Sequence, residues 1–453
     1  MSESVQPAAR FCDTDIVKRL SMKILLLDHG HISDGLSQVL VPEGHDVYAT
    51  NSHYGTARWG VKTLGFNPGD PFTGVLEEKW DLVVACNTYA NKSGVVEAFR
   101  DRGIPTIGAG AKGFRLEEKI VGRYAFSESE FKCPRWFACP STKDAIERLG
   151  EGLLNSVVVK FAETNRPHRT MVCRTIADAI RFLSKAPDGE LVLEEIVDGY
   201  EIAFSAYFDG KKFVQTVTNC EHKHMFPGNM GILVPEMGTL AFYDPMPKIQ
   251  ELLDSLLDSS SAREHLQDYR GLIDVNCIVS GLGEVYALEF TCRFGVPISD
   301  IMTGLLKVDG STYGEFLLSV ATGDADPTLL KHREGFAIGA NMVVCGYGYH
   351  EVHEDICNLD SEITGLEMLT CHHTLGDVTV RDGKICTAHP WVGCIVGVGY
   401  NVSAARAQML FNAKKIGFQD KVYRKDIGER FSHDVSMFFA ADLVSERTLR
   451  YAN

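Results

Sequence analysis

The chain has 453 residues, of which 45% are hydrophobic and 23% are charged, and it carries a formal net charge of −15. This length is enough for several domains, since one domain usually contains about 100 to 200 residues. The longest apolar runs, such as residues 24–27, are far shorter than the roughly 20 residues that cross a bilayer, and an acidic surface repels nucleic-acid phosphates, so we expect neither a membrane protein nor a general nucleic-acid binder.

The first 21 residues are interpreted as an N-terminal tail. They have mixed charge and lack the apolar core of an export signal, which favours the cytoplasm. The 13 cysteines include no Cys-x-x-Cys pair, and Cys277 and Cys292 fall in apolar strands. Reduced, buried thiols are therefore expected rather than disulfides or a zinc site.

Residues 22–116 alternate short apolar strands with helical stretches. Strands that end at or beside Gly, Asn or Asp are predicted at 23–28, 82–86 and 106–110. Such alternation is typical of a parallel α/β sheet, in which ligands bind at the carboxyl ends of the strands. Asp28, His29 and Asn87 fall at these ends, although ordinary turns explain them equally well.

Residues 117–333 show a second, mixed pattern. Ser141 precedes Asp144 with the cap-and-acid spacing of a helix start, and another helix opens at Thr175. Strand-like segments on both sides of the second helix indicate half of a nucleotide clamp, at 156–162 and 191–197. Further strands indicate an antiparallel-rich part, at 201–208, 212–217, 272–279 and 285–290.

Beyond about residue 334 the chain returns to short strands, which are predicted at 337–345 and 379–387. A helix follows, and we expect Ser403 to cap it and Gly417 to stop it. This part is interpreted as a small closing domain.

The segment 272–295 predicts a β-hairpin. If its turn contains two residues, Asp274 lies opposite Glu289, and Thr291 shares their face. Opposed carboxylates among apolar neighbours are destabilising unless a cation lies between them, and oxygen ligands favour Mg²⁺. A three-residue turn would shift the register and separate the two acids, and two acids on a solvated face are a further alternative.

Other charged residues also interrupt apolar strands. Lys160 follows three valines, where a cation fits best if it points at an anion; a strand-end lysine that reaches solvent is the alternative. Glu194 and Glu195 can accept hydrogen bonds from adenine and ribose, and a plain strand end explains them as well. Mg²⁺ held by one or two carboxylates usually completes its shell with water and nucleotide phosphates, so the pattern suggests phosphoryl transfer from ATP.

Four segments carry a family resemblance: Leu193-Glu-Glu-Ile-Val-Asp-Gly-Tyr-Glu201, Leu288-Glu-Phe-Thr-Cys-Arg-Phe-Gly295, Cys345-Gly-Tyr-Gly348 and Tyr423-Arg-Lys-Asp-Ile-Gly428. Together, and in this order, they resemble glycinamide ribonucleotide synthetase, the phosphoribosylamine–glycine ligase family of the ATP-grasp superfamily. The match extends from about residue 22 to 431. The Cys-Arg-Phe-Gly and Arg-Lys-Asp-Ile-Gly pieces are specific, whereas many ATP-grasp proteins share the Glu-Glu strand.

The resemblance implies an α/β and α+β multidomain protein with the ATP-grasp fold. The expected order is an N-terminal parallel α/β domain (the preATP-grasp domain), an ATP-grasp domain with a smaller and a larger subdomain, and a C-terminal domain with its tail. The corresponding limits are 22–116, 117–333 (divided into about 117–195 and 196–333) and 334–453.

The resemblance also implies ATP between the two subdomains, with Mg²⁺ or Mn²⁺ as the metal. Asp274 matches no acid of this ligase family, but similar superfamily members use an aspartate on that strand. The expected ATP-binding residues are Lys119, Lys160, Glu194, Glu195, Val197 and Glu201. The expected metal ligands are Asp274, Glu289 and Thr291, and the expected catalytic residues are Lys160 and Arg293. The expected substrate-binding residues are His29, His31, Asn87, His222, Lys223 and Arg293.

Several elements of the family are replaced in this chain. Asp28-His-Gly-His-Ile-Ser-Asp-Gly35 stands where the family has its phosphate loop, and Val296-Pro-Ile298 stands where it has Asp-Pro-Glu. Residues 163–170 contain no glycine in place of the Gly-rich loop over ATP, and Thr291 replaces the usual asparagine. The metal site therefore differs from that of the family, and the sequence does not identify the substrates.

We expect an ATP-dependent carboxylate–amine ligase that forms an amide through an acyl phosphate. Its substrates would be an amino acid or small carboxylate and a small or nucleotide-linked amine, and the protein would be a monomer or homodimer. One alternative is an authentic phosphoribosylamine–glycine ligase of purine biosynthesis, and another is a non-catalytic ATP-binding protein. The histidine clusters at 221–224 and 371–374 lack the ligand spacing of a structural zinc site.

Overall fold

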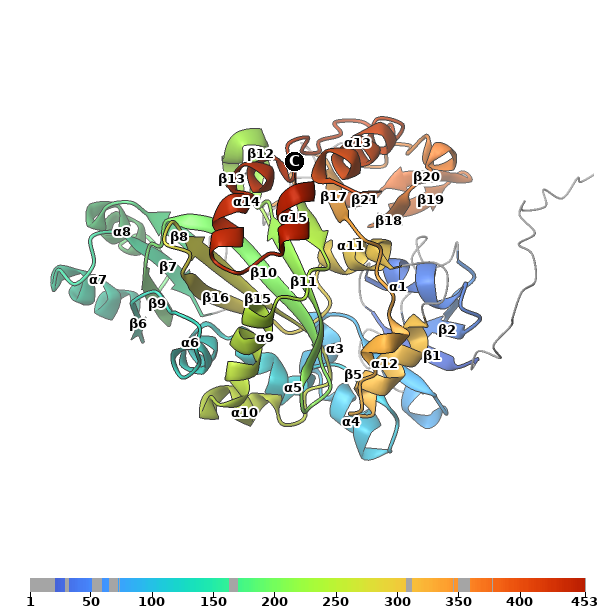
Figure 1. The fold of residues 1–453 in the computed structure, drawn as a ribbon, viewed down its shortest axis with the longest axis horizontal. Helices are drawn as coiled ribbons and strands as arrows, with labels where there is room; N and C mark the ends of the chain where they lie inside the picture. The colour runs from blue at the N-terminus through green and yellow to red at the C-terminus, as the bar shows by residue number, and fades with distance from the viewer. Residues whose placement is uncertain are drawn as a thin grey trace, which may run out of the picture.

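The structure is a computed structural model that describes residues 21–28, 32–50, 59–64, 72, 74–162, 170–306, 312–344, 346–348, 359–376 and 378–452. Figure 1 shows the N-terminal unit at one end of the molecule and a small sheet with two helices at the other end, with a large sheet between them. The position of this small sheet relative to the large one determines where the candidate site lies.

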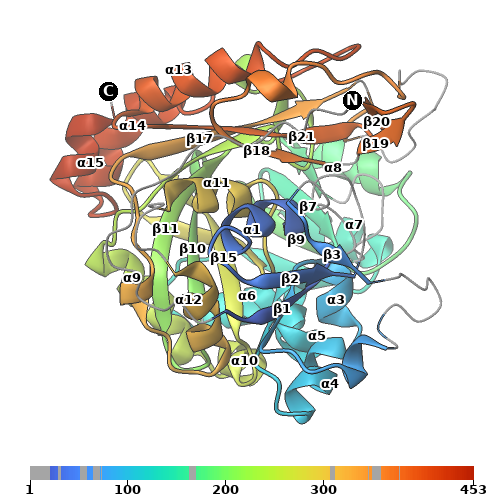
Figure 2. The same cartoon turned by 90° about the vertical axis from the view of Figure 1, so that its right-hand side faces the viewer.

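The N-terminal unit is built on a five-stranded sheet in the order β3-β2-β1-β4-β5, and all neighbouring strands in it are parallel. Apart from Lys23, the central strands consist of apolar residues, which suits strands that helices and the rest of the protein cover on both faces. The parallel α/β sheet expected for residues 22–116 is thus confirmed (Figure 2). The elements are β1 (Lys23–Leu27), α1 (Ile32–Leu40), β2 (Asp46–Ala49), β3 (Lys62–Thr63), β4 (Leu82–Ala85), α3 (Thr88–Lys92), α4 (Val95–Asp101), β5 (Thr106–Ile107) and α5 (Gly110–Phe114).

The small sheet has the order β6-β9-β7-β8, and its strands are antiparallel. Its two helices begin where the sequence predicts, because the side chains of Ser141 and Thr175 accept hydrogen bonds from backbone N–H groups in the first helical turns. The sheet and its helices have a hydrophobic core of their own. The elements are β6 (Trp136–Cys139), α7 (Thr142–Gly150), β7 (Val157–Phe161), β8 (Thr170–Cys173), α8 (Ile176–Leu183) and β9 (Leu191–Glu195).

The large sheet has eight antiparallel strands in the order β16-β15-β10-β11-β14-β17-β21-β18. Cys277 lies within it, whereas Cys292 is one residue past the end of β16; both are buried, free thiols. The strands are β10 (Gly199–Phe208), β11 (Phe213–Glu221), β14 (Gly238–Phe242), β15 (Gly271–Ser280), β16 (Val285–Thr291), β17 (Phe336–Val343), β18 (His372–Leu375) and β21 (Trp391–Gly399).

The C-terminal part continues this sheet. The limit predicted at residue 334 falls just before β17, whose first five residues pair with the whole of β14. The single strand predicted at 379–387 is wrong, because a turn at Asp382 and Gly383 divides it into β19 (Val378–Arg381) and β20 (Lys384–Thr387). The expected cap Ser403 is also wrong: α13 (Val402–Ala413) is capped by Asn401, whose side chain accepts from the Ala404 N–H.

Helices cover both faces of the large sheet. On one face, α14 packs against β10, where the rings of Tyr200 and Phe438 lie 5.0 Å apart. On the other face, Ile301 and Phe316 share a buried cluster with the N-terminal strands. No helix in the described part of the chain is both long and apolar enough to cross a membrane. The remaining elements are α6 (Lys119–Ser127), β12 (His224–Phe226), β13 (Met230–Leu233), α9 (Pro247–Asp254), α10 (Ser260–Leu266), α11 (Ile298–Leu305), α12 (Tyr313–Ala321), α14 (Glu429–Ala440) and α15 (Glu446–Tyr451).

Candidate active site

A cavity of about 990 Å³ lies between the small sheet and one end of the large sheet, and we call it the main cavity. Its walls come from β7, β8 and β9 on one side and from β10, β11 and β16 on the other, with residues of the segment 424–430 at the rim. The predicted site residues that line it are Lys160, Glu194, Glu195, Val197, Glu201, His222, Lys223 and Glu289. The structure therefore brings together residues that are far apart in the sequence: Lys160 and Glu289 are separated by 129 positions.

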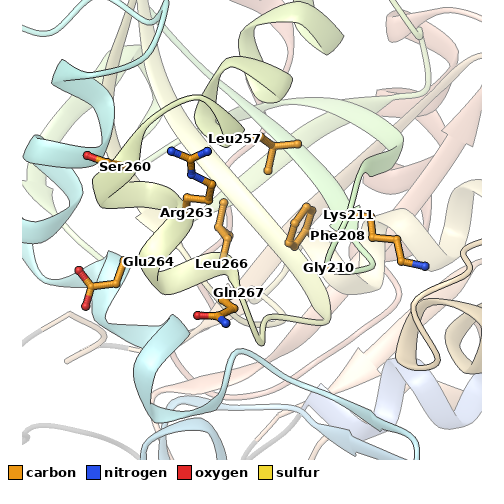
Figure 3. A pocket seen from close by; sticks show the side chains of 9 residues that line it. All are labelled: Phe208, Gly210, Lys211, Leu257, Ser260, Arg263, Glu264, Leu266 and Gln267. Carbon is orange, nitrogen blue, oxygen red and sulfur yellow. The ribbon is translucent and has the colours of Figure 1, made fainter.

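A second, more open cavity of about 590 Å³ lies at the opposite end of β10, beside α10 (Figure 3). It is lined by apolar side chains such as Phe208 and Leu257, together with Lys211 and Arg263. The Lys211 ammonium donates a hydrogen bond to the backbone carbonyl of Gly323. Because no described residue predicted for the site lines this cavity, the main cavity is the candidate active site.

The β15–β16 hairpin exists as predicted, but its register differs. Asn276, and not Asp274, lies opposite Glu289, and Asp274 lies opposite Thr291. The turn is longer than two residues, since the Ser280 N–H donates to the Glu284 carbonyl, and a β-bulge at Leu288 adds a further shift. The predicted facing of Asp274 and Glu289 is therefore wrong.

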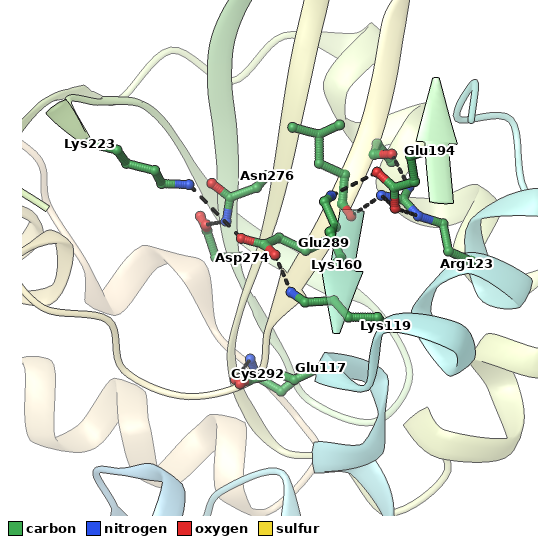
Figure 4. Close-up of polar contacts among 12 residues, drawn as sticks. Glu117, Lys119, Arg123, Lys160, Glu194, Lys223, Asp274, Asn276, Glu289 and Cys292 are labelled. Carbon is green, nitrogen blue, oxygen red and sulfur yellow. Dashed lines mark hydrogen bonds and ion pairs between the residues drawn. The ribbon is translucent and has the colours of Figure 1, made fainter. Parts of the chain in front are cut away.

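Glu289 is surrounded by cations. It accepts an ion-paired hydrogen bond from Lys119 at the start of α6, and Lys223 Nζ lies 4.0 Å from its other oxygen (Figure 4). The Lys119 ammonium holds the pKa of this carboxyl well below its usual range, against the opposing effect of burial. Glu289 is thus an anion at neutral pH, the form in which a carboxyl group binds a metal ion.

Asp274 and Asn276 form a buried polar pair beside Glu289. The Asp274 carboxylate accepts hydrogen bonds from Ser205, Asn219 and Asn276, the last at 3.2 Å. The Asn276 amide nitrogen donates to Asp274, and the amide oxygen of the same side chain is buried without a partner among the described residues. Burial raises the pKa of Asp274, and the hydrogen bonds from Ser205 and Asn219 oppose that effect. Sequence reasoning missed Asn276, since only the bulge places it opposite Glu289.

Lys160 belongs to a buried charge triad. Its ammonium lies 2.8 Å from Glu194 Oε2, and the other oxygen of Glu194 accepts from Arg123 at 2.6 Å. Burial lowers the pKa of Lys160, partly offset by Glu194. The prediction that Lys160 faces an anion agrees with this geometry, although the anion in the structure is Glu194. That glutamate's predicted contact with adenine or ribose stays a prediction, because its carboxylate is already paired.

Glu201 and Lys223 meet on the floor of the main cavity. Lys223 Nζ lies 2.7 Å from Glu201 and 3.0 Å from Glu221, a carboxyl that was not predicted. Burial raises the pKa of Glu221 to about 7, and Lys223 counteracts this effect. The Lys223 ammonium therefore pairs with both Glu201 and Glu221. The remaining lone pairs of these two carboxylates can accept hydrogen bonds from the hydroxyl groups of a bound ligand.

Arg293 and Thr291 lie outside the lining of the main cavity. Arg293 Nε is 3.5 Å from Glu117, and the same carboxylate accepts from the Cys292 N–H at 2.7 Å. Arg293 thus makes a structural ion pair with Glu117, and its catalytic role stays a prediction.

Asn87 lies at the carboxyl end of β4, in the N-terminal unit. It caps α3 through Ala90 and donates to Asp28 at 3.2 Å, so the two residues predicted for this rim contact each other. Neither lines the main cavity. The predicted substrate residues His29 and His31 lie outside the described residues.

The rim of the main cavity is closed by a buried arginine that sequence reasoning missed. Arg424 makes a two-point contact with Asp426 and donates to the His224 carbonyl and to Asn229, both at 3.1 Å. Asp426 in turn accepts from the Gly228 N–H at 3.0 Å. These contacts tie the C-terminal segment to the β12–β13 hairpin, and we call them the rim clamp.

His222 is buried beside the rim clamp, and its Nε2 accepts a hydrogen bond from the Gly428 N–H at 3.3 Å. Burial, together with the nearby Arg424 guanidinium, lowers the pKa of His222 to about 4. The imidazole is therefore neutral in the folded protein near pH 7, and an accepting nitrogen is consistent with that state.

The low pKa of His222 predicts a loss of stability in acid. An unfolded histidine binds a proton below about pH 6.5, so between that pH and about 4 the unfolded state binds more protons and acid favours unfolding. We expect the free energy of unfolding of the wild type to fall by about 3 kcal/mol more than that of His222→Gln when the pH drops from 7 to 4. Denaturant titrations at several pH values measure this difference, and parallel curves for the two proteins would contradict it.

In the described part of the chain, no three His, Cys, Asp or Glu side chains are placed to hold a metal ion together. The oxygen donors beside Glu289 are instead one further carboxylate, one amide oxygen and one hydroxyl, from Asp274, Asn276 and Thr291. Such a set suits Mg²⁺, which typically takes one or two carboxylates and completes its shell with water and phosphate oxygens.

The arrangement of two sheets around a lysine-rich and carboxylate-rich cavity is that of the ATP-grasp fold. Residues 118–299 match the family model described as "Phosphoribosylglycinamide synthetase, ATP-grasp (A) domain". This range includes the whole small sheet and the β15–β16 hairpin. These parts of the chain therefore form an ATP-grasp domain.

Two comparisons extend beyond this range. The phosphoribosylamine–glycine ligase of Pseudomonas aeruginosa is 26% identical over 360 residues, which are 75% of this chain and 80% of that protein. The crystal structure of the phosphoribosylamine–glycine ligase of Thermotoga maritima matches with a TM-score of 0.72 and 19% identity, over 89% of this chain and 100% of that one. Residues 118–299 thus form an ATP-grasp domain in a chain that is similar, at low identity, to phosphoribosylamine–glycine ligases, and the expected resemblance is confirmed.

A more distant structure shares the fold as well. The biotin carboxylase domain of Hydrogenobacter thermophilus 2-oxoglutarate carboxylase, in complex with MgADP, matches with a TM-score of 0.62 and 13% identity, over 95% of this chain and 98% of that one. The architecture is therefore common to ATP-grasp proteins that act on different substrates, and the fold alone does not select a substrate.

Proposed function

We propose that the protein is an ATP-dependent carbon–nitrogen ligase that joins a small carboxylate to an amine through an acyl phosphate. The observation that supports this most directly is the convergence of Lys160 and Glu289 on the main cavity from two separate elements, with Lys119 paired to Glu289 from a third. Each of these charges is paired with a side chain of opposite sign, and MgATP offers both signs in one ligand. Bound nucleotide can therefore replace these internal partners.

In this proposal the metal would be held by Glu289, Asp274 and Asn276, with Thr291 as a further oxygen donor. The unpartnered amide oxygen of Asn276 is the feature that fits a cation best, because a buried acceptor without a partner is costly. Mg²⁺ or Mn²⁺, when bound there, would neutralise the negative charge on the phosphoryl group that is transferred.

The nucleotide would lie along the small sheet. Lys119 and Lys160 would contact phosphate oxygens, and the strand around Glu195 and Val197 would face adenine. Lys223 donates to one carboxylate oxygen of Glu201, and the other oxygen would accept a hydrogen bond from a ribose hydroxyl.

The reaction proposed here has two steps. A carboxylate oxygen of the substrate attacks the γ-phosphorus of ATP while the bond to ADP breaks, which gives an acyl phosphate. The amine nitrogen then attacks the acyl carbon, and inorganic phosphate leaves. The lysines stabilise the charge on the phosphoryl group, and no side chain of the protein becomes covalently modified.

The substrates are proposed as classes only: an amino acid or small carboxylate, and a small or nucleotide-linked amine. His29, His31, Asn87, His222, Lys223 and Arg293 stay the proposed substrate residues. The relatives support one specific version, in which the protein is a phosphoribosylamine–glycine ligase. The domain limits at 22–116, 117–333 and 334–453, action in the cytoplasm and a monomeric or homodimeric state are part of the same proposal.

The experiment that tests the proposed function is ADP release by the purified protein with MgATP, scanned over pairs of amino acids and amines. The scan includes glycine with phosphoribosylamine. Turnover with that pair would assign phosphoribosylamine–glycine ligation, and turnover with another pair would assign a different ligase reaction. ATP binding without ADP release from any pair would favour a non-catalytic ATP-binding protein.

The register of the hairpin leads to a separate prediction about the metal. We expect Asn276→Ala to raise the Mg²⁺ concentration for half-maximal ATP turnover about ten-fold, because it removes the amide oxygen opposite Glu289. Glu284→Gln is the comparison, since Glu284 lies in the same hairpin, pairs with Lys132 and is not among the proposed ligands. Mg²⁺ titrations of ADP release measure both variants, and an unchanged requirement in Asn276→Ala would show that the amide is not a ligand.

A further inference from the structure

Arg123 is one helical turn after Lys119 on α6, so both side chains point to the same side of the helix. Its guanidinium is only 1% exposed and belongs to the largest fully buried side chains of the protein. A fully buried cation is unfavourable unless every donor is used, and the partners of Arg123 therefore indicate what it does.

One side of the guanidinium holds the small sheet. Arg123 Nε donates to Glu194 Oε1 at 2.6 Å, and the terminal nitrogen Nη2 lies 2.5 Å from the same oxygen. The second oxygen of Glu194 is 2.8 Å from the Lys160 ammonium. Through this glutamate, Arg123 fixes the direction in which Lys160 can point (Figure 4).

The other side of the guanidinium holds the large sheet. Nη1 donates to the Ala287 carbonyl at 2.6 Å, and Nη2 donates to the Leu288 carbonyl at 2.5 Å. Leu288 is the extra residue of the β-bulge, because Cys277 pairs with Ala287 and Asn276 pairs with Glu289. A bulge leaves its extra residue without a strand partner and re-aims the next side chain. Arg123 thus provides a hydrogen-bond donor for the carbonyl of the bulge residue Leu288, and this bulge places Glu289 opposite Asn276.

We propose that Arg123 is a positioning residue that sets Lys160 and Glu289 in their places relative to each other, from the two sheets on either side of the main cavity. This inference rests on the proposed function, in which Lys160 contacts ATP phosphates and Glu289 holds the metal. Arg123 itself lines no part of the main cavity, so it acts through these two residues.

The contacts of Arg123 require an arginine and not only a positive charge. A planar guanidinium offers five donors in a fixed geometry, whereas a lysine ammonium is a single point on a flexible stem. Lysine at this position can pair with Glu194 but cannot also bridge the Ala287 and Leu288 carbonyls. Arg123→Lys therefore keeps the charge and removes the bridge between the sheets.

The test measures binding of the non-hydrolysable analogue AMP-PNP with Mg²⁺ by calorimetry, together with acylation of Lys160 by a lysine-reactive reagent, read by mass spectrometry. We expect Arg123→Lys to weaken analogue binding about 10- to 100-fold, as is typical when the residues that orient metal ligands are changed. We also expect faster acylation of Lys160, since Glu194 holds it less firmly. The matched control is Arg181→Met, on the exposed side of α8, where the arginine pairs with Asp178 one helical turn away.

If Arg123→Lys does not fold, Arg123→Met combined with Glu194→Gln removes two of the three charges of the buried triad, and the amide oxygen introduced at position 194 can still accept from the Lys160 ammonium. Glu194→Gln alone shows how much of the change comes from the glutamate. Weakened analogue binding in a folded double variant, beyond that of Glu194→Gln, supports the positioning role. Wild-type binding in the folded double variant, or in Arg123→Lys, overturns it.

The readouts separate this inference from the proposed function. If the wild type does not bind AMP-PNP, the proposed ATP site is wrong, but acylation of Lys160 still reports whether Arg123 orients it. Faster acylation in Arg123→Lys than in the wild type then supports the positioning role, and equal rates overturn it.

Discussion

Glu289→Gln is expected to lower kcat for ATP turnover by about 100- to 1,000-fold, the usual loss when one group that stabilises transition-state charge is removed. The substitution preserves size but removes the anion that Lys119 and the proposed metal share. Lys119 then loses its buried partner, so phosphate binding should change along with metal binding. Steady-state ADP release at several Mg²⁺ concentrations measures the effect.

A control for this variant lies in the same hairpin. Glu284→Gln changes a partly exposed acid that pairs with Lys132 and does not line the main cavity. We expect ATP turnover within about two-fold of the wild type in this control, because exposed ion pairs contribute little. Normal turnover in Glu289→Gln would remove the basis for the proposed metal site.

Arg424→Met is expected to destabilise the protein by about 3 to 5 kcal/mol, the cost of breaking a buried ion pair by removing one partner. The Arg424 side chain is 1% exposed and makes four hydrogen bonds. Its loss leaves Asp426 with an unpaired charge and frees the β12–β13 hairpin from the C-terminal segment. Denaturant unfolding monitored by circular dichroism measures the free energy.

The comparison for this variant is Arg450→Met on α15, where the arginine makes an exposed pair with Glu446. We expect a change below about 0.5 kcal/mol there, since such helical pairs are weak. Equal losses in the two variants would mean that the rim clamp adds nothing beyond an ordinary surface ion pair.

Features that depend on neighbouring residues could be predicted from the sequence. The helix starts at Ser141 and Thr175 follow from side chains that reach N–H groups three residues away. The buried strands β1 and β4 follow from unbroken apolar runs, and the hairpin follows from two such runs around glycines. Each of these signals is complete within a short window of the chain.

Register and long-range pairing could not be predicted in the same way. The bulge at Leu288 shifts the alternation of buried residues in β16, but residues 285–288 are all apolar, so the sequence gives no sign that Asn276 replaces Asp274 opposite Glu289. Arg123 and Glu194 are 71 residues apart, and the rim clamp joins Arg424 to Asn229 over 195 residues. Nothing local distinguishes these arginines from the exposed ones, because their burial arises only when the sheets come together.

The pairing of β17 with β14 has a consequence for the chain as a whole. If residues after 334 were absent, β14 would become the last strand of its sheet, with unpaired N–H and C=O groups along an apolar strand. Such open edges recruit strands from other molecules and promote aggregation. The C-terminal part therefore protects the ATP-grasp domain from self-association, whatever else it does, and the two cannot be separated at this limit without a solubility cost.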